Sequence, residues 1–430
     1  MLHFHLPDRA GFCMKLKIGV IVVALALLTA CGPQEEPTAP ASDTRLANEQ
    51  FDAAVQEMTA AYFYHVPEAA TQLGISEDTV PGTNHRMMDR SVDGNAARNR
   101  ALEAALEGLH AIEAETLSPD RQRTHAVLTT LFEGALAPSR VVGYGTTAGA
   151  WTLWFLPYAI VQNSGPTVDI PNFLNSQQPV TNAEEAEAYL VRLASVRDAL
   201  DGALESYRHG VQQGAIPPDF VVEKSLAVVE AFIEPPAGQN PMYVSFTDKL
   251  ERAGIENAEA YADRALRIID ADVIPAYQRI ADYMGEIRAS APHDACIWRL
   301  PDGEALKAAK IRHMTDSNLS AEDIHRTGHD EVDRITREMD DILRSEGYTE
   351  GPVGERMQQL NVEPRFLYSN DAEGKEKLLN DVRAQVDGMY AELPNWFRRL
   401  PKHKVEAVSY THLTLPTRCH RCRSRWSPDH

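Results

Sequence analysis

The sequence predicts an all-α, mainly helical protein, on three observations. Apolar residues recur every three or four positions from Asn48 onward, which is the period of an amphipathic helix. Alternating polar and apolar runs, which are typical of strands, are sparse. Helix-start signals recur as well, as in Ser118-Pro119-Asp120, where Ser is a favoured N-cap and Pro takes the first helical position. Most of the chain is therefore expected to form packed helices.

In the first part of the chain the pattern predicts three helices. The first ends near Pro67, and its apolar face comprises Phe51, Val55, Met58 and Tyr62. The second covers about 96–110. The third begins at Pro119 and continues into an apolar face that includes Val127, Leu128 and Leu131.

Residues 143–171 interrupt the helical pattern with Gly, Trp, Pro and Asn, which predicts a long irregular connection. Its glycines, Gly143, Gly145 and Gly149, do not have the spacing of a dinucleotide-binding loop, and no clear strand precedes them. The aromatic residues Trp151, Trp154 and Phe155 allow two interpretations, the lining of a pocket or the packing of the loop itself, and packing is favoured.

Further helices are predicted in the second part. One begins after Asn182 and runs to about His209, with a buried stripe formed by Tyr189, Leu193, Val196, Leu200, Leu204 and Tyr207. After Pro217-Pro218 the next spans about 219–233. Another covers about 257–284, where Pro275 should produce a kink near Val273. Ser320 and Asp323 form a capping box for a helix at about 321–346, and a last helix covers about 372–392.

The N-terminal part resembles a bacterial lipoprotein leader. Lys15 and Lys17 precede an apolar run from Ile18 to Ala30, which is too short to span a bilayer and is typical of a secretory signal. The run closes in Leu28-Thr29-Ala30-Cys31, a lipobox-like sequence, so Cys31 is the predicted site of lipid attachment. Residues 14–30 are therefore assigned to the signal peptide, and residues 1–13 to an upstream start called too early.

Residues 31–47 are rich in Pro, Ala, Thr and Glu and cannot build a core, so they predict a tether between the lipid and the folded domain. The expected location is the cell envelope, lipid-anchored and facing the periplasm. Gly32 after the cysteine slightly favours the outer membrane by resemblance to the bacterial sorting rule. The membrane is thus the first expected partner.

The C-terminal residues 408–430 differ in composition from the rest. Ser409 to Thr417 looks like translated sequencing adaptor, and arginines crowd the residues that follow. Cys419 and Cys422 lack the second pair of ligands that a zinc site would need. This segment is interpreted as adaptor-derived or out-of-frame sequence, which leaves 48–407 as a partial helical domain.

Charge and cysteine content limit the possible functions. Asp and Glu outnumber Lys and Arg by 62 to 42, which argues against a nucleic-acid partner. An apolar fraction of 43% is that of an ordinary globular protein. Between the two atypical ends only Cys31 and Cys296 remain, and lipid would consume the first, so no intramolecular disulfide is expected. Cys296 is interpreted as a partly buried, inert thiol rather than a nucleophile.

One helix carries a pattern that invites a metal interpretation. His325, His329 and Asp333 lie four residues apart, but Arg326 stands where the zinc peptidase pattern needs Glu. Three ligands on successive helical turns also spread over about 12 Å, too far for one tetrahedral ion. No nucleophile elbow, phosphate loop or His-Glu-x-x-His is present, so no catalytic residue and no metal ligand is assigned in this chain.

A series of spaced motifs resembles the DUF 885 family, a bacterial family of unknown function. The matching segments cover about 48–407 and are Pro67 to Gly74, Leu117 to Asp120, Gly210 to Pro218, Val273 to Tyr277, Trp298 to Gly303, and Ile324 to Gly328. The resemblance implies a helical scaffold similar to thermolysin-like and neurolysin-like zinc peptidases. It also implies zinc as a cofactor and a peptide substrate for the intact protein.

The same resemblance places the zinc motif of the family well after Leu400-Pro401, beyond what this sequence contains. The chain is therefore expected to be inactive as given. It also has Leu306-Lys307 where relatives tend to have paired tyrosines. The alternative function is a non-catalytic helical binding or scaffold lipoprotein, and a serine peptidase ranks last because no nucleophile elbow is present.

Overall fold

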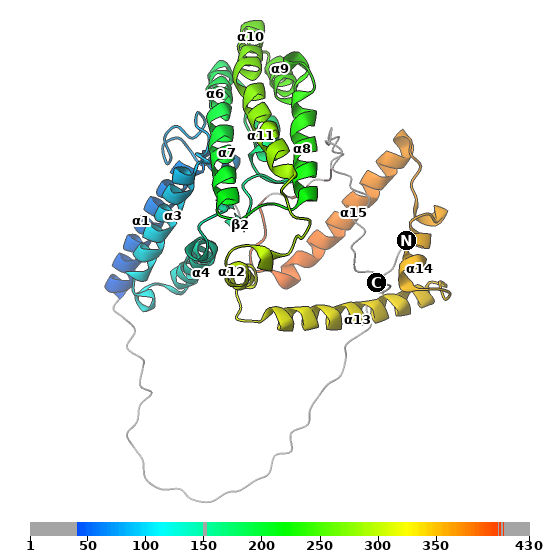
Figure 1. Ribbon diagram of the computed structural model, residues 1–430. Coiled ribbons are helices and arrows are strands. Elements are labelled where there is room, and N and C mark those ends of the chain that lie inside the picture. Colours follow the sequence, from blue (N-terminus) through cyan, green and yellow to red (C-terminus); the bar gives the residue numbers. More distant parts are fainter. Residues whose placement is uncertain (1–40, 149–152, 403, 406, 408–430) are drawn as a thin grey trace, which may run out of the picture. The chain divides into compact units, whose positions relative to one another are not determined.

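The structure is a computed structural model that describes residues 41–148, 153–402, 404, 405 and 407 (Figure 1). Cys31, the predicted signal peptide, residues 31–40 of the predicted tether, the tail from 408 and Trp151 lie outside the described residues. Residues 41–47, which were also assigned to the tether, are helical in the structure, so the first helix begins earlier than predicted. The described chain divides into two compact units, one ending at Ser320 and the other beginning at Ala321. Each unit is described by itself.

The described residues confirm the predicted all-α class. The first unit contains the helices α1 (Ala41–His65), α2 (Pro67–Gln72), α3 (Val92–His110), α4 (Pro119–Val141), α5 (Pro166–Ser176), α6 (Ala183–Ala194), α7 (Val196–Gln212), α8 (Asp219–Ile233), α9 (Pro241–Ala253), α10 (Ala258–Ile268), α11 (Ile274–Arg288) and α12 (Gly303–Thr315). The second contains α13 (Ala321–Ser345), α14 (Val353–Leu360) and α15 (Ala372–Trp396). Short 3-10 turns occur at Ala114–Thr116, Ala237–Gln239, Ile297–Arg299 and Pro364–Phe366.

The prediction of an irregular connection over 143–171 was partly wrong. The strands β1 (Thr146–Ala148) and β2 (Trp154–Leu156) pair antiparallel there, with Thr147 opposite Phe155. Helix α5 already begins at Pro166, after Gly165. Three-residue strands are too short for an alternating pattern to be recognised in the sequence, which is why they were missed.

The single helix predicted from Asn182 to about His209 is two helices. Ser195 separates α6 from α7, and its N–H donates to Arg192 O at 3.0 Å while its hydroxyl donates to Val191 O at 3.1 Å. The ψ of Ser195 is −6°, so the regular α-helical geometry is interrupted at this residue. The predicted stripe is nevertheless buried on both helices, so the apolar pattern was right although the break was not foreseen.

The structure has a π-helical turn at the place where the sequence predicts a kink, near Val273. Residues Ile269–Val273 join α10 to α11 in this conformation, directly before Pro275. A wider turn accommodates the missing N–H of a proline without ending the helix. The chain therefore runs from Ala258 to Arg288 as one continuous helical element.

The main core lies among α5 to α11, where these helices pack against one another (Figure 1). Two aromatic stacks anchor it: Tyr189 on Phe246, with ring centroids 4.3 Å apart, and Phe232 on Tyr277, at 4.0 Å. Helices α1, α3 and α4 pack together around smaller apolar clusters. The first unit therefore has a contiguous core with satellite clusters.

A buried arginine joins α6 to the segment that follows α2. The side chain of Arg192 is fully buried and donates to Arg86 O at 2.9 Å, to Thr83 O and to Gln178 Oε1. No carboxylate contacts it among the described residues, and its guanidinium lies 4.9 Å from the centre of the Phe173 ring. Backbone carbonyls thus take the role that a counter-ion usually has.

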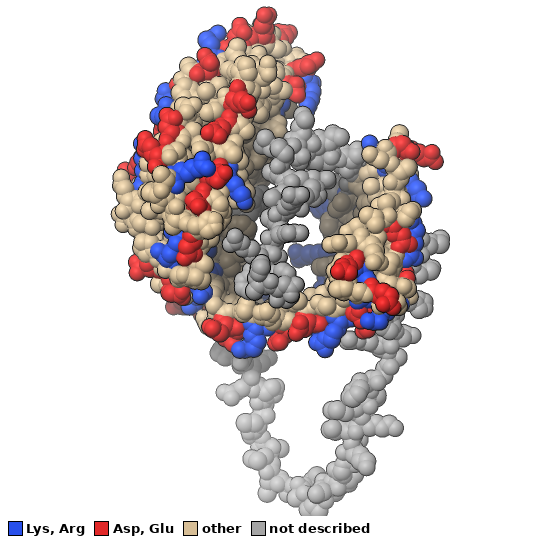
Figure 2. Space-filling view, turned by 45° about the vertical axis from the view of Figure 1, so that its right-hand side comes forward, with Lys and Arg blue, Asp and Glu red and all other residues tan. Residues whose placement is uncertain are grey.

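The second unit has little buried surface of its own. Of the described residues from Ala321 onward, only Leu343, Arg356 and Gly374 are buried. Large apolar side chains such as Val332 on α13 and Met389 on α15 are more than 60% exposed. Acidic and basic side chains are interspersed on the face of the molecule shown in Figure 2. No helix in the described part of the chain is long and apolar enough to cross a membrane.

Candidate functional site

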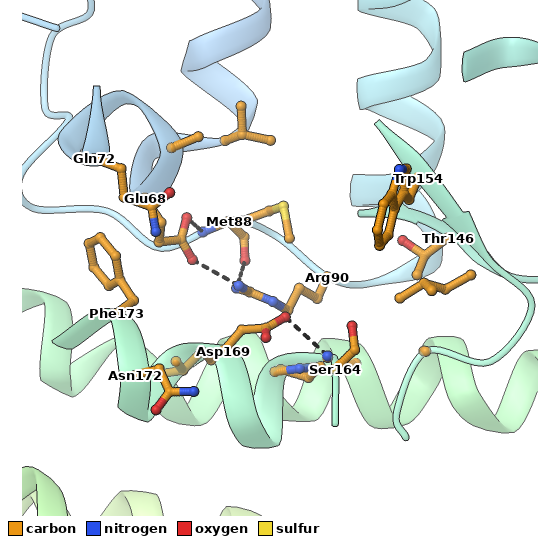
Figure 3. Close-up of a pocket in the computed structure, with 18 of the residues that line it drawn as sticks. Glu68, Gln72, Met88, Arg90, Thr146, Trp154, Ser164, Asp169, Asn172 and Phe173 are labelled. Atoms are coloured by element: carbon orange, nitrogen blue, oxygen red, sulfur yellow. Dashed lines mark hydrogen bonds and ion pairs between the residues drawn. The ribbon is translucent and has the colours of Figure 1, made fainter. Parts of the chain in front are cut away.

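A cavity of about 420 Å³ lies in the first unit, between α2, the segment before α3, the β1–β2 hairpin and α5 (Figure 3). Its apolar wall includes Val66, Met88 and Phe173. Its polar lining includes three charged side chains, Glu68, Arg90 and Asp169, and the amides and hydroxyls of Gln72, Thr146, Ser164, Asn172, Ser176 and Gln177. The volume falls within the range of roughly 300–1,000 Å³ that is usual for small-molecule sites.

Gly165 sets the start of α5 and with it one side of the cavity. Its φ is +99°, a conformation that glycine adopts far more readily than other residues. A Cβ at this position would lie 2.7 Å from Ala159 O. Helix α5 can therefore begin this close to residues 159–160 only because residue 165 has no side chain.

Glu68 and Arg90 form an ion pair in the cavity wall. Oε1 of Glu68 lies 3.0 Å from Nη2 of Arg90, and the two side chains are only 12% and 11% exposed. The other carboxylate oxygen accepts from Met88 N at 2.9 Å, while Arg90 donates to Met88 O at 3.1 Å. Figure 3 shows the arginine between the carboxylates of Glu68 and Asp169. Both members of the pair are thus held by protein contacts.

Asp169 is the charged group of the cavity with the fewest protein contacts. Its Oδ2 accepts from Gly165 N at 3.0 Å, and no hydrogen bond to Oδ1 is found among the described residues. The residue is exposed because it faces the open cavity, yet the surrounding protein raises its carboxyl pKa by desolvation. Arg90 and the Gly165 N–H oppose this shift, whereas Glu68 adds to it.

The structure separates the aromatic residues of the hairpin. Trp154 lines the cavity, as Figure 3 shows, and its side chain is half-exposed. Phe155 is buried and packs with Tyr144 and Leu306. The favoured interpretation, packing, was therefore right for Phe155 and wrong for Trp154. Alternation along a strand explains the difference, because neighbouring side chains point to opposite faces.

The histidines of α13 do not form a metal site with Asp333. Nε2 of His325 lies 3.2 Å from Nε2 of His329, and both residues are exposed. Within the described residues no group of three or more His, Cys, Asp or Glu is arranged to hold a metal. The described residues therefore do not fit the zinc ion that the family resemblance implies, and no chemical step is assigned to a metal here.

Cys296 is half-buried, and desolvation followed by the neighbouring Asp294 carboxylate raises the pKa of its thiol. A raised pKa keeps the group as the unreactive thiol. This supports the interpretation of an inert cysteine. Leu306, at the position where relatives tend to have aromatic residues, is fully buried in the cluster with Phe155 and does not line the cavity.

The charged residues of the cavity were not identified as functional from the sequence. Glu68 lies within the Pro67–Gly74 segment that carried the family resemblance, but nothing in that segment indicates a pocket. Arg90 and Asp169 are 79 residues apart in sequence and meet only in the folded unit. The one local signal was Gly165-Pro166, a helix start whose first turn contains Asp169.

Fold and site define a helical protein with a small charged cavity set against its main core. The chain belongs to the DUF885 family, described as "Bacterial protein of unknown function", whose model matches residues 67–412. It is also similar to the crystal structure of "the putative lipoprotein from Colwellia psychrerythraea", with a TM-score of 0.78 and 25% sequence identity. The match covers 83% of this chain and 61% of that one, so this chain spans less than two thirds of the length of its structural relative. No curated protein matches the sequence.

Proposed function

We propose that this chain is the ligand-binding part of a lipid-anchored protein of the cell envelope, and that the cavity beside α5 binds short peptides. The observation that carries the proposal is the meeting of three charged side chains, Glu68, Arg90 and Asp169, in one cavity of about 420 Å³. Desolvated charges in a concave, partly apolar site are typical of binding sites. The non-catalytic binding protein that the sequence left as an alternative is thus the function favoured here.

Calorimetric titration of the full chain with trialanine tests this function. Trialanine is small, carries both terminal charges and leaves the polar lining free to bond its amides. We expect saturable binding that is weakened or lost in Ser176→Trp, because Ser176 lines the cavity and is exposed, so a large side chain there can occupy the cavity without entering the core. Saturable binding that Ser176→Trp leaves unchanged would place the ligand elsewhere.

The lipid anchor at Cys31 is part of the same proposal. Its support is the lipobox-like sequence Leu28 to Cys31 and the likeness to a structure described as a lipoprotein. We expect Cys31→Ala to move the protein from the membrane fraction to the soluble fraction of cells, while the matched control Cys296→Ala stays with the membrane. Persistent membrane attachment of Cys31→Ala would contradict a lipid anchor at this residue. Attachment to the outer rather than the inner membrane is proposed on Gly32 alone.

A second proposal concerns the whole protein, which the family resemblance implies to be a zinc-dependent peptidase. Its support is the family resemblance, and the coverage of the structural relative is compatible with it, since 39% of that chain (100% minus 61%) has no counterpart here. Zinc ligands are then expected outside residues 1–430. Metal analysis of the purified 430-residue chain should find no stoichiometric zinc, and one zinc per chain would overturn this placement. Long-read sequencing of the gene beyond the codon for Ala407 tests whether a zinc motif follows.

A further inference from the structure

The charges of the cavity point to the part of the ligand that it recognises. Its ionisable lining consists of two carboxylates, Glu68 and Asp169, and one guanidinium, Arg90, so the ionised lining has a net charge of −1. Glu68 and Arg90 neutralise each other at 3.0 Å and are largely covered by protein. The charge that remains available is that of Asp169.

Asp169 has fewer protein partners than the other two groups. One backbone N–H contacts Oδ2, and no hydrogen bond to Oδ1 is found among the described residues, although the residue lines the cavity and is exposed. A carboxylate oxygen without a donor is open to a cationic ligand, which would supply both a hydrogen bond and an opposite charge. Arg90 attracts the Asp169 carboxylate, but no hydrogen bond joins the two among the described residues, because Nη1 of Arg90 donates to Met88 O and Nη2 pairs with Glu68.

The half-exposed ring of Trp154 supplies a second element suited to a cation. The indole face is the most favourable aromatic surface for an ammonium group, and Trp154 lies in the same cavity wall as Thr146 (Figure 3). Met88 and Phe173 provide apolar surface between the charged groups and the surrounding helices. Carboxylate, aromatic ring and apolar wall together match an ammonium group attached to a short organic chain.

We propose that the cavity recognises a primary ammonium group, the free amino terminus of a short peptide, through the carboxylate of Asp169. This rests on the proposed peptide-binding function and specifies which end of the peptide enters the cavity. The Glu68–Arg90 pair acts as a positioning pair that keeps the wall rigid, and it does not contact the carboxylate end of the ligand.

Three probes separate this inference from the function on which it rests. The full chain is titrated with trialanine, with N-acetyl-trialanine, which lacks the ammonium group, and with trialanine amide, which lacks the carboxylate. We expect trialanine and its amide to bind alike and the acetylated peptide to bind at least about tenfold more weakly, the usual effect of losing a charge-assisted hydrogen bond. Asp169→Asn should reduce trialanine binding by a similar factor.

Asp93→Asn is the matched control, because Asp93 is also an acidic residue in the first turn of a helix but does not line the cavity. It should bind as the unmodified chain does. Equal binding of the acetylated peptide, or loss of binding with the amide only, would overturn recognition of the ammonium group while leaving the cavity as a peptide site. Failure of all three probes to bind would overturn the proposed function itself.

Discussion

Replacement of Arg192 by methionine tests whether a single buried cation holds the cavity wall in place. Methionine keeps an unbranched side chain of similar length but has no donor. Three carbonyl oxygens would lose this donor, namely Thr83 O, Arg86 O and Gln178 Oε1. The Thr71 hydroxyl, which Arg192 also contacts at 3.2 Å, keeps its contacts with Pro67 O and Asn84 Oδ1. Each buried acceptor left without a donor costs about 1–3 kcal/mol, so the loss before compensation is roughly 3–9 kcal/mol.

Part of that loss is recovered, because the variant no longer has to bury a positive charge. The cost of burying this charge is seen in the pKa of Arg192, which desolvation lowers to about 10. We therefore expect a net decrease of about 3–5 kcal/mol in the free energy of unfolding. At about 2–4 °C per kcal/mol for a unit of this size, the melting temperature should fall by roughly 6–20 °C.

Thermal melting followed by circular dichroism measures the global effect, and limited digestion with trypsin measures the local one. The segment that Arg192 holds contains Arg86 and leads to Arg90, so trypsin should cut after these residues faster in the variant. The control is Arg197→Met on α7, where the arginine is 47% exposed, so its ion pairs with Asp198 and Asp272 should contribute little to stability. A loss below about 1 kcal/mol in Arg192→Met, with unchanged digestion, would refute the reasoning.

Three further predictions concern the site and its surroundings. Gly165→Ala should lower the free energy of unfolding by about 2–4 kcal/mol, because it combines a positive φ with a contact to Ala159 O, and a denaturant titration within 1 kcal/mol of the unmodified chain would contradict this. Asp169→Asn should raise the melting temperature at neutral pH. Folding raises the pKa of the Asp169 carboxyl, so the ionised carboxylate lowers the stability of the folded chain above that pKa. The increase in melting temperature that the variant gives should therefore become smaller when thermal melts are measured at about pH 4 instead of about pH 8. Glu187→Gln should lower the free energy of unfolding by less than about 1 kcal/mol in a denaturant titration, because both side chains of the Glu187–Arg264 pair are more than 40% exposed. Two hydrogen bonds of 2.7 and 2.6 Å join the pair, and a larger loss would show that they contribute substantially to stability.

Long periodic helices could be predicted from the sequence. The breaks between helices, and the residues that come together in the folded chain, could not. Helix α8 has the predicted bounds, Asp219 and Ile233, since Pro218 precedes it and an apolar face continues through it. At the break, Ser195 has a ψ of −6° and its N–H bonds Arg192 O, three residues back, while no change of apolar period marks the position in the sequence. Local pattern determines where a helix runs more reliably than where it is interrupted.

The candidate site was beyond prediction for a different reason. Glu68, Arg90 and Asp169 are ordinary charged residues near helix starts and turns, and the interpretation that an isolated charge lies on a solvated face is usually correct. Their significance comes from their meeting in one cavity, which depends on how α2, α5 and the segment before α3 pack. The aromatic residues of the hairpin came closer to prediction, because Trp154 was considered as a pocket residue before packing was favoured.

The small buried area of α13, α14 and α15 has a consequence for the rates at which their backbone amides exchange with deuterated solvent. Helices derive most of their stability from packing, and this unit has only three buried residues in its described part. Its amides should exchange through local opening that costs little free energy, while those of α7 around Leu200 exchange only when the main core opens. Exchange in the second unit is therefore a sensitive reporter of any surface that comes to cover Val332 or Met389.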